Sequence, residues 1–87
     1  MAGPQIRPSA RKHGISDERM LYVLRTCPRP LEHPAGAGLV IYLAPDREGV
    51  PLEVVAFEDD DGQLTIIHAM RLRPSYKKTY EEVMRWL

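Results

Sequence analysis

Three short stretches of the chain are mostly apolar and rich in β-branched residues. They cover residues 39–44, 52–57 and 64–70, and this pattern is typical of β-strands. The connecting segments, PDREGVP and EDDDG, are short and rich in turn-forming residues, as consecutive antiparallel hairpins require. The pattern therefore predicts a three-stranded antiparallel meander.

A helix is predicted before this meander. Ser16 can cap its N-terminus, and acidic residues follow in the first turn, where the helix dipole favours negative charge. The helix should run to about Thr26, because Pro28 and Pro30 then stop it. The apolar residues that it should bury along one stripe are Met20, Leu21, Leu24 and Cys27.

The N-terminal segment can hold two smaller elements. Residues 5–9 could form a short edge strand, because Pro8 lacks an N–H group and is tolerated only at the edge or the end of a sheet. Ser9 could then cap a brief helical segment through Lys12, which Gly14 would end.

A last helix is predicted at the C-terminus, opened by Pro74 or Ser75. Apolar residues recur there at helical spacing and form one stripe. They are Tyr76, Tyr80, Val83, Met84 and Leu87. This helix could dock on the sheet or present a surface to a partner chain.

Together these elements predict one α+β domain over residues 1–87, with residues 1–5 flexible and residues 31–38 a loop rich in proline and glycine. The expected architecture is a small antiparallel sheet, consisting of the three-stranded meander and the N-terminal edge strand. Two N-terminal helices and the C-terminal helix complete it.

Composition narrows the class of protein. The chain has 87 residues, 44% of them hydrophobic and 28% charged, which is ordinary globular composition. It contains no apolar run of transmembrane length and no signal-peptide segment at its start, which predicts a cytoplasmic protein that does not enter a membrane. The single cysteine, Cys27, fits a reducing compartment.

Charge is balanced overall but unevenly distributed. Twelve Lys and Arg oppose twelve Asp and Glu, so net charge gives no argument for nucleic acid. Basic residues gather in residues 1–29 and again after Gln63, whereas the middle of the chain is acidic. If the two ends meet in the fold, they would form a basic zone that could bind RNA. The alternative is that these charges lie on solvated helix faces.

Three motifs resemble segments of a known toxin family. Residues 12–16 read KHGIS, residues 66–70 read IIHAM and residues 80–82 read YEE. They resemble the KHGVS, IISAR and YEE segments of BrnT-type toxins, a branch of the RelE-like toxins, in the same order. The resemblance implies a RelE-like fold, cleavage of mRNA without a cofactor, and a complex with a cognate antitoxin, with a homodimer or a hetero-oligomer as the assembly.

The sequence departs from that family at one functional position. Met70 stands where the family has an arginine that could hold the scissile phosphate, and His68 stands where the family has serine. Two alternatives follow. Either the chemistry is rearranged around His68, or the chain is a catalytically inactive module that binds a partner through its sheet edge or its C-terminal helix.

RNA cleavage without a metal needs a base, an acid and a cation. His68 is the first candidate for base or acid, because imidazole titrates near neutral pH, and the resemblance adds His13. Strand alternation places His68 on the same face as Ile66, but it does not say which face of the sheet is open. Both histidines could instead serve as hydrogen-bonded structural residues.

Other side chains could complete such a site. Arg71 or Arg73 could supply the positive charge, and Tyr76 has a hydroxyl group that could join the chemistry. The candidates for RNA phosphate contacts are Arg11, Lys12, Lys77 and Lys78. No metal site is expected, because His33 lacks a partner at ligand spacing and residues 59–62 (DDDG) lack the pattern of a calcium loop.

Overall fold

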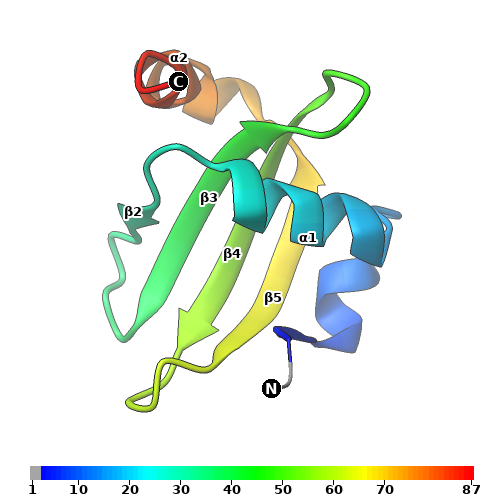
Figure 1. The fold of residues 1–87 in the computed structure, drawn as a ribbon, viewed down its shortest axis with the longest axis vertical. Coiled ribbons are helices and arrows are strands. Elements are labelled where there is room, and N and C mark those ends of the chain that lie inside the picture. Colours follow the sequence, from blue (N-terminus) through cyan, green and yellow to red (C-terminus); the bar gives the residue numbers. More distant parts are fainter. Residues whose placement is uncertain (1–2) are drawn as a thin grey trace.

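A computed structural model describes residues 3–87, and its architecture is α+β. The elements in chain order are β1 (Gln5–Ile6), the 3₁₀ helix η1 (Pro8–Arg11), α1 (Asp17–Thr26), β2 (Leu31–Glu32), β3 (Leu39–Pro45), β4 (Pro51–Glu58), β5 (Leu64–Arg71), the 3₁₀ helix η2 (Pro74–Tyr76) and α2 (Lys77–Met84). In Figure 1, α1 crosses in front of the three long strands and α2 lies at the upper end of the sheet.

The sheet corrects the prediction of a small antiparallel sheet built on a three-stranded meander. It has five strands in the order β1-β5-β4-β3-β2, and it is mixed, because β1 runs parallel to β5. The strands β3, β4 and β5 lie where the apolar runs predicted strands. The fifth strand, β2, falls in the predicted loop 31–38, since a two-residue strand is too short to show alternation.

The prediction of two N-terminal helices is also wrong. Of the two helices predicted in this N-terminal part, only α1 forms an α-helix. Ser16 caps it by accepting a hydrogen bond from the backbone N–H of Arg19 at 3.3 Å. The earlier segment is a single 3₁₀ turn, because Pro8 supplies a helical φ but no N–H group. It also shortens the expected strand over residues 5–9 to Gln5–Ile6. The flexibility expected for residues 1–5 lies outside the described residues at positions 1 and 2.

Each face of the sheet has its own hydrophobic core. On one face, α1 and η1 bury residues such as Met20, Val23 and Ala10 against Val54 and Ile66. On the other face, α2 packs over β3 and buries Val83. The apolar residues of the sheet that form this second core are Ile41, Leu43 and Val55. The first face is covered by α1 and η1. The second is covered by α2 over β3 and remains open beside β5.

A β-bulge in β5 changes which residues share a face. Val55 pairs with His68 and Ala56 pairs with Ile66, so Ile67 has no opposite residue in β4. The prediction that His68 shares a face with Ile66 is therefore wrong, because the extra residue shifts the alternation by one. Ile66 lies in the core under α1, whereas His68 turns to the face that carries α2. The hydroxyl of Ser9 donates to the carbonyl of Ile67 at 3.1 Å and satisfies the bulge from the η1 side.

The C-terminal helix is shorter than predicted. Residues 74–76 form the 3₁₀ turn η2, and α2 ends at Met84. Leu87, which we placed on the apolar stripe, is 82% exposed, because the helix ends before it and does not carry it back to the sheet. In the part of the chain that is described, no helix has the length and apolar character needed to cross a membrane.

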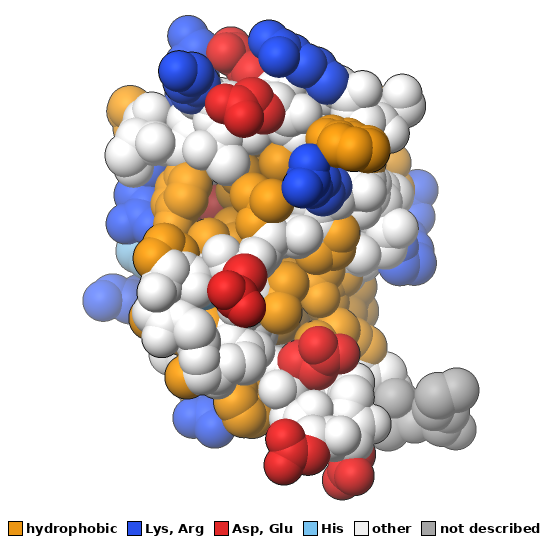
Figure 2. All heavy atoms as spheres, turned by 90° about the vertical axis from the view of Figure 1, so that its left-hand side faces the viewer, with side chains coloured by type: hydrophobic (Ala, Val, Ile, Leu, Met, Phe, Trp, Pro, Cys, Tyr) orange, Lys and Arg blue, Asp and Glu red, His pale blue; other side chains and the backbone are white. Residues whose placement is uncertain are grey.

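On the β2 side of the molecule, charged and hydrophobic side chains lie in different regions of the surface. Figure 2 shows hydrophobic side chains in a band across the middle of this side, with mixed charges above it and acidic side chains below it. The lower, acidic end is the β4–β5 hairpin, where Asp59, Asp60 and Asp61 lie exposed. On this side of the molecule, acidic side chains therefore gather at the hairpin.

The β3–β4 turn is tied to α1 by one buried carboxylate. Asp46 accepts hydrogen bonds from the backbone N–H groups of Glu48 and Val50, each at 2.9 Å, and from Arg19 Nε at 2.9 Å. The hydrogen bond from Val50 is the main reason that the pKa of Asp46 is lowered, and those from Glu48 and Arg19 add to it. The charged form of Asp46 is therefore the form that stabilises the fold.

Replacing Asp46 with asparagine should destabilise the protein at neutral pH and have less effect in acid. A carboxylate whose pKa is lowered on folding stabilises the fold above its unfolded pKa, about 3.9, and this contribution is lost as pH falls through the folded pKa. Urea unfolding of both proteins near neutral pH and near pH 3 measures the difference. An equal gap in the urea midpoint at the two pH values would contradict this account.

Candidate active site

A buried carboxylate in the central strand organises the candidate site. Glu53 lies in β4, between β3 and β5, and is only 1% exposed. Burying a carboxylate is costly unless charged or hydrogen-bonding groups surround it. Glu53 accepts from the backbone N–H of Arg73 at 3.2 Å, from Arg73 Nε at 2.7 Å and from His68 Nε2 at 3.1 Å. Its two oxygen atoms therefore hold one cation and one imidazole in fixed positions.

His68 is held by this carboxylate in a defined orientation. Because a carboxylate accepts hydrogen bonds, the short contact assigns the ring proton to Nε2 and leaves the lone pair on Nδ1. The side chain is 29% exposed, so solvent and small ligands can reach the ring. An imidazole oriented by a carboxylate and open to solvent is suited to accept a proton.

A second imidazole lies next to the first. His13 follows η1, and its ring meets the ring of His68 edge to face, with centroids 5.7 Å apart and planes inclined by 75°. The turn after His13 depends on Gly14, whose φ of +77° favours glycine. Residues that are 55 positions apart in the sequence are thus brought together because η1 packs along the outer edge of β5.

Arg73 connects the carboxylate to an aromatic ring. Its guanidinium group contacts Glu53, and its Cζ lies 5.6 Å from the centroid of the Tyr76 ring. Half of the Arg73 side chain remains exposed. A guanidinium group has five N–H donors, so Arg73 can bind Glu53 and still donate to an anion. The five residues in contact, His13, Glu53, His68, Arg73 and Tyr76, are called the Glu53 cluster below.

A basic surface pocket adjoins the Glu53 cluster and shares Arg73 with it. Its volume is about 650 Å³. It lies where β5 passes into η2 and α2, and Arg71, Arg73 and Lys77 line it together with Glu81. Three cations against one carboxylate make this pocket attractive to phosphate groups.

The remaining predicted site residues lie farther from the Glu53 cluster. Arg11 forms a two-point ion pair with Asp17, at 2.9 Å for each contact, and this pairing lowers the pKa of Asp17 and raises that of Arg11. Lys12 is exposed next to His13. Lys78 is exposed on α2 and does not line the basic pocket. The structure thus joins His13, His68, Arg73 and Tyr76, places Arg71 and Lys77 beside them, and leaves Arg11, Lys12 and Lys78 at the periphery.

His33, which we set aside as a metal ligand, has a local role. Its Nδ1 accepts a hydrogen bond from the backbone N–H of Ala35 at 3.0 Å, which fixes the turn between β2 and β3. Within residues 3–87, no three His, Cys, Asp or Glu side chains are grouped as a metal site would require.

Sequence reasoning missed Glu53, although the sequence contained a signal for it. The strand reads LEVVAF, with one charged residue in an otherwise apolar run. A near-continuous apolar run indicates a strand that is covered on both faces of the sheet, so a charge within it is buried and needs partners. That signal identifies Glu53 as unusual, but only the folded chain shows that its partners are His68 and Arg73.

Comparisons of the chain with protein-family models, with curated proteins and with solved structures gave no match.

Proposed function

We propose that this protein is the toxin of a toxin–antitoxin pair, a ribonuclease that cleaves mRNA by acid–base chemistry without a metal. The observation that carries the proposal is that the buried Glu53 carboxylate holds His68 and Arg73 together beside a basic pocket. The resemblance of the three motifs to BrnT-type toxins supports the same function. His13, which matches the first motif, and His68, which replaces the serine of the second, both belong to the Glu53 cluster.

The roles of the residues follow from the chemistry of the phosphodiester. Nδ1 of His68 takes the proton of the ribose 2′-hydroxyl, and the 2′-oxygen attacks the adjacent phosphorus. The bond to the 5′-oxygen breaks, and that oxygen receives a proton from His13 or Tyr76. The products are a 2′,3′-cyclic phosphate and a 5′-hydroxyl group. Arg73 donates to the phosphate oxygens, where negative charge develops in the transition state.

Arg73 could replace the arginine that BrnT-type toxins have at the position of Met70. Met70 pairs with Glu53 across the strands, so it lies next to the carboxylate. Arg73 contacts that same carboxylate from the end of β5. A cation is therefore present beside Met70 even though residue 70 does not provide it. This supports the alternative in which the chemistry is rearranged around His68.

Expression of the chain tests the proposal. Under a tightly controlled promoter, the wild-type protein should arrest growth and degrade cellular RNA. The purified protein should cleave single-stranded RNA in the presence of a chelator and leave 2′,3′-cyclic phosphate ends. An Arg47→Gln variant serves as a control, because Arg47 pairs with Glu18 on the surface, outside the Glu53 cluster. Healthy growth and intact RNA with the wild-type protein would refute a ribonuclease.

A second candidate function is an inactive module that binds a partner protein. The exposed aromatic side chains favour it: Trp86 is 62% exposed and Phe57 is 39% exposed, and aromatic residues are enriched at protein interfaces. In that case the Glu53 cluster would be a structural ion pair. The same experiment separates the two candidates, because a binding module would leave RNA intact.

A further inference from the structure

A second hollow lies on the opposite side of α2 from the basic pocket. Its volume is about 470 Å³, and it is formed by the outer side of α2 and the segment that leads into β2. The residues that line it are Arg29, Leu31, Thr79, Glu82, Val83, Arg85 and Trp86. None of them belongs to the Glu53 cluster, so this hollow is a separate site.

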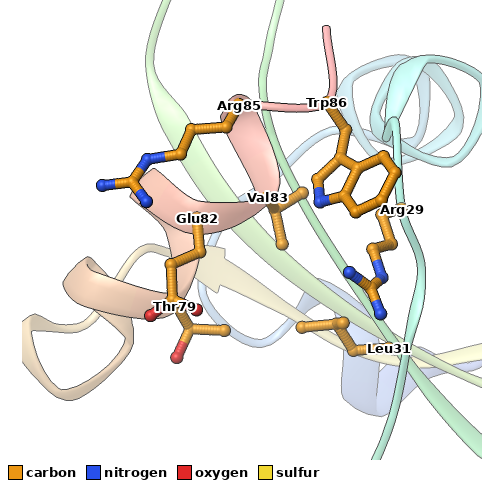
Figure 3. Close-up of a pocket in the computed structure, with 7 residues that line it drawn as sticks. All are labelled: Arg29, Leu31, Thr79, Glu82, Val83, Arg85 and Trp86. Atoms are coloured by element: carbon orange, nitrogen blue, oxygen red, sulfur yellow. The ribbon is translucent and has the colours of Figure 1, made fainter.

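The hollow has an aromatic wall, a polar wall and an apolar floor. Figure 3 shows Trp86 and Arg29 on one side, Glu82 and Thr79 on the other, and Val83 with Leu31 between them. The guanidinium carbon of Arg29 lies 4.7 Å from the centroid of the Trp86 ring. The indole and the guanidinium group are therefore in cation–π contact, and together they supply the flat surfaces of the hollow.

The side chains that line the hollow carry more positive than negative charge. Among the described residues, neither Arg29 nor Arg85 has an Asp or Glu oxygen within 4.0 Å. Glu82 is the one acidic residue in the lining. Two cations and one carboxylate leave a net positive charge, which favours an anionic ligand that also carries hydrogen-bond donors.

These features match one chemical class of ligand. Unpaired nucleobases stack on aromatic rings and on guanidinium planes. A carboxylate accepts hydrogen bonds from the amino and ring N–H groups of a base edge, and an arginine binds the adjoining phosphate. A flat, donor-bearing group with an attached anion fits this arrangement: Trp86 and Arg29 offer flat surfaces, Glu82 lies across from them, and Arg85 extends at the outer edge of the hollow (Figure 3).

We infer that this hollow is a binding subsite for an unpaired base of single-stranded RNA, with the phosphate of that nucleotide on Arg85. The inference rests on the proposed function, since the bound strand is the one that the Glu53 cluster cleaves. Because the hollow and the basic pocket lie on opposite sides of α2, the subsite takes a nucleotide outside the pair that flanks the scissile phosphate.

The fluorescence of the protein reports directly on this site, because Trp86 is the single tryptophan of the chain. A short 2′-O-methyl RNA, which cannot be cleaved by attack of a 2′-hydroxyl, should quench the fluorescence saturably. Arg29→Gln should weaken this binding about tenfold, as expected for the loss of one stacking surface. The matched control is Arg25→Gln, which removes an exposed arginine stacked on Tyr22 outside the hollow and should bind as the wild type does.

Three results would overturn the inference. The first is fluorescence that does not respond to RNA. The second is equal weakening by Arg29→Gln and Arg25→Gln, and the third is equal quenching by polyphosphate, which carries no bases. Failure of the proposed function looks different: the RNA would bind and quench, but unmodified RNA would stay intact. Cleavage without quenching would leave the ribonuclease standing and remove the subsite.

Discussion

Replacing His68 with alanine is expected to lower the rate of RNA cleavage by about 10²–10⁴-fold, the range that a positioned acid or base contributes. The substitution removes the imidazole whose Nδ1 accepts the 2′-hydroxyl proton, while Glu53 keeps its contacts with Arg73. The side chain is 29% exposed, so its truncation leaves no deep cavity and the fold should persist. Single-turnover cleavage of a labelled RNA measures the rate, and circular dichroism checks the fold.

His33→Ala is the matched control for this substitution. It removes an imidazole that has a hydrogen bond to the backbone of its own turn and lies outside the Glu53 cluster. The cleavage rate of His33→Ala should stay close to that of the wild type. Expression of His68→Ala, by contrast, should no longer arrest growth. A His68→Ala protein that cleaves RNA at the wild-type rate would show that His68 is a structural residue.

Replacing Glu53 with glutamine is expected to lower both activity and stability. The amide keeps the shape of the side chain but loses the charge that attracts Arg73 and orients His68. We expect kcat to fall about a hundredfold, as for a reacting group held out of position. The free energy of unfolding should fall by about 2 kcal/mol, less than for a fully buried pair, because half of Arg73 is exposed.

A split between kcat and KM distinguishes a positioning role from a purely structural one. Glu53 is buried and touches no substrate, so KM measured on the folded protein should change little. Glu48→Gln is a control of the same chemical change at an exposed position in the β3–β4 turn. Loss of activity that matches only the fraction of unfolded protein would contradict the positioning role of Glu53.

The sequence predicted the regular elements better than the way they join. The apolar runs that became β3, β4 and β5 and the Ser16 cap of α1 are local features, so they can be read from neighbouring residues. By contrast, the pairing of Gln5 with Thr65 and of Leu31 with Ile41 depends on distant parts of the chain. Strands of two residues leave no pattern of their own, and the five-stranded mixed sheet was therefore not foreseen.

The candidate site could be predicted only in part, because its assembly also depends on parts of the chain that are far apart in the sequence. The sequence points to the other four residues of the Glu53 cluster through their side-chain chemistry and, for the two histidines, through the motif resemblance. Their assembly depends on the bulge at Ile67, which turns His68 to the face of Glu53. Strict alternation cannot reveal such a bulge, because one inserted residue reverses the side that every later residue takes. Arg71 lines the basic pocket, and among the described residues it forms no ion pair with Glu53.

The Glu53 cluster draws its members from almost the whole length of the chain. His13 comes from the N-terminal turn, Glu53 from the central strand and Tyr76 from the last 3₁₀ helix. A fragment that lacks either His13 or Tyr76 cannot contain the whole cluster, and the cluster cannot form before both Arg73 and Tyr76 have been synthesised. Any activity of the cluster is therefore coupled to the assembly of the whole sheet, and a proteolytic cut that separates residue 13 from residue 76 would abolish it.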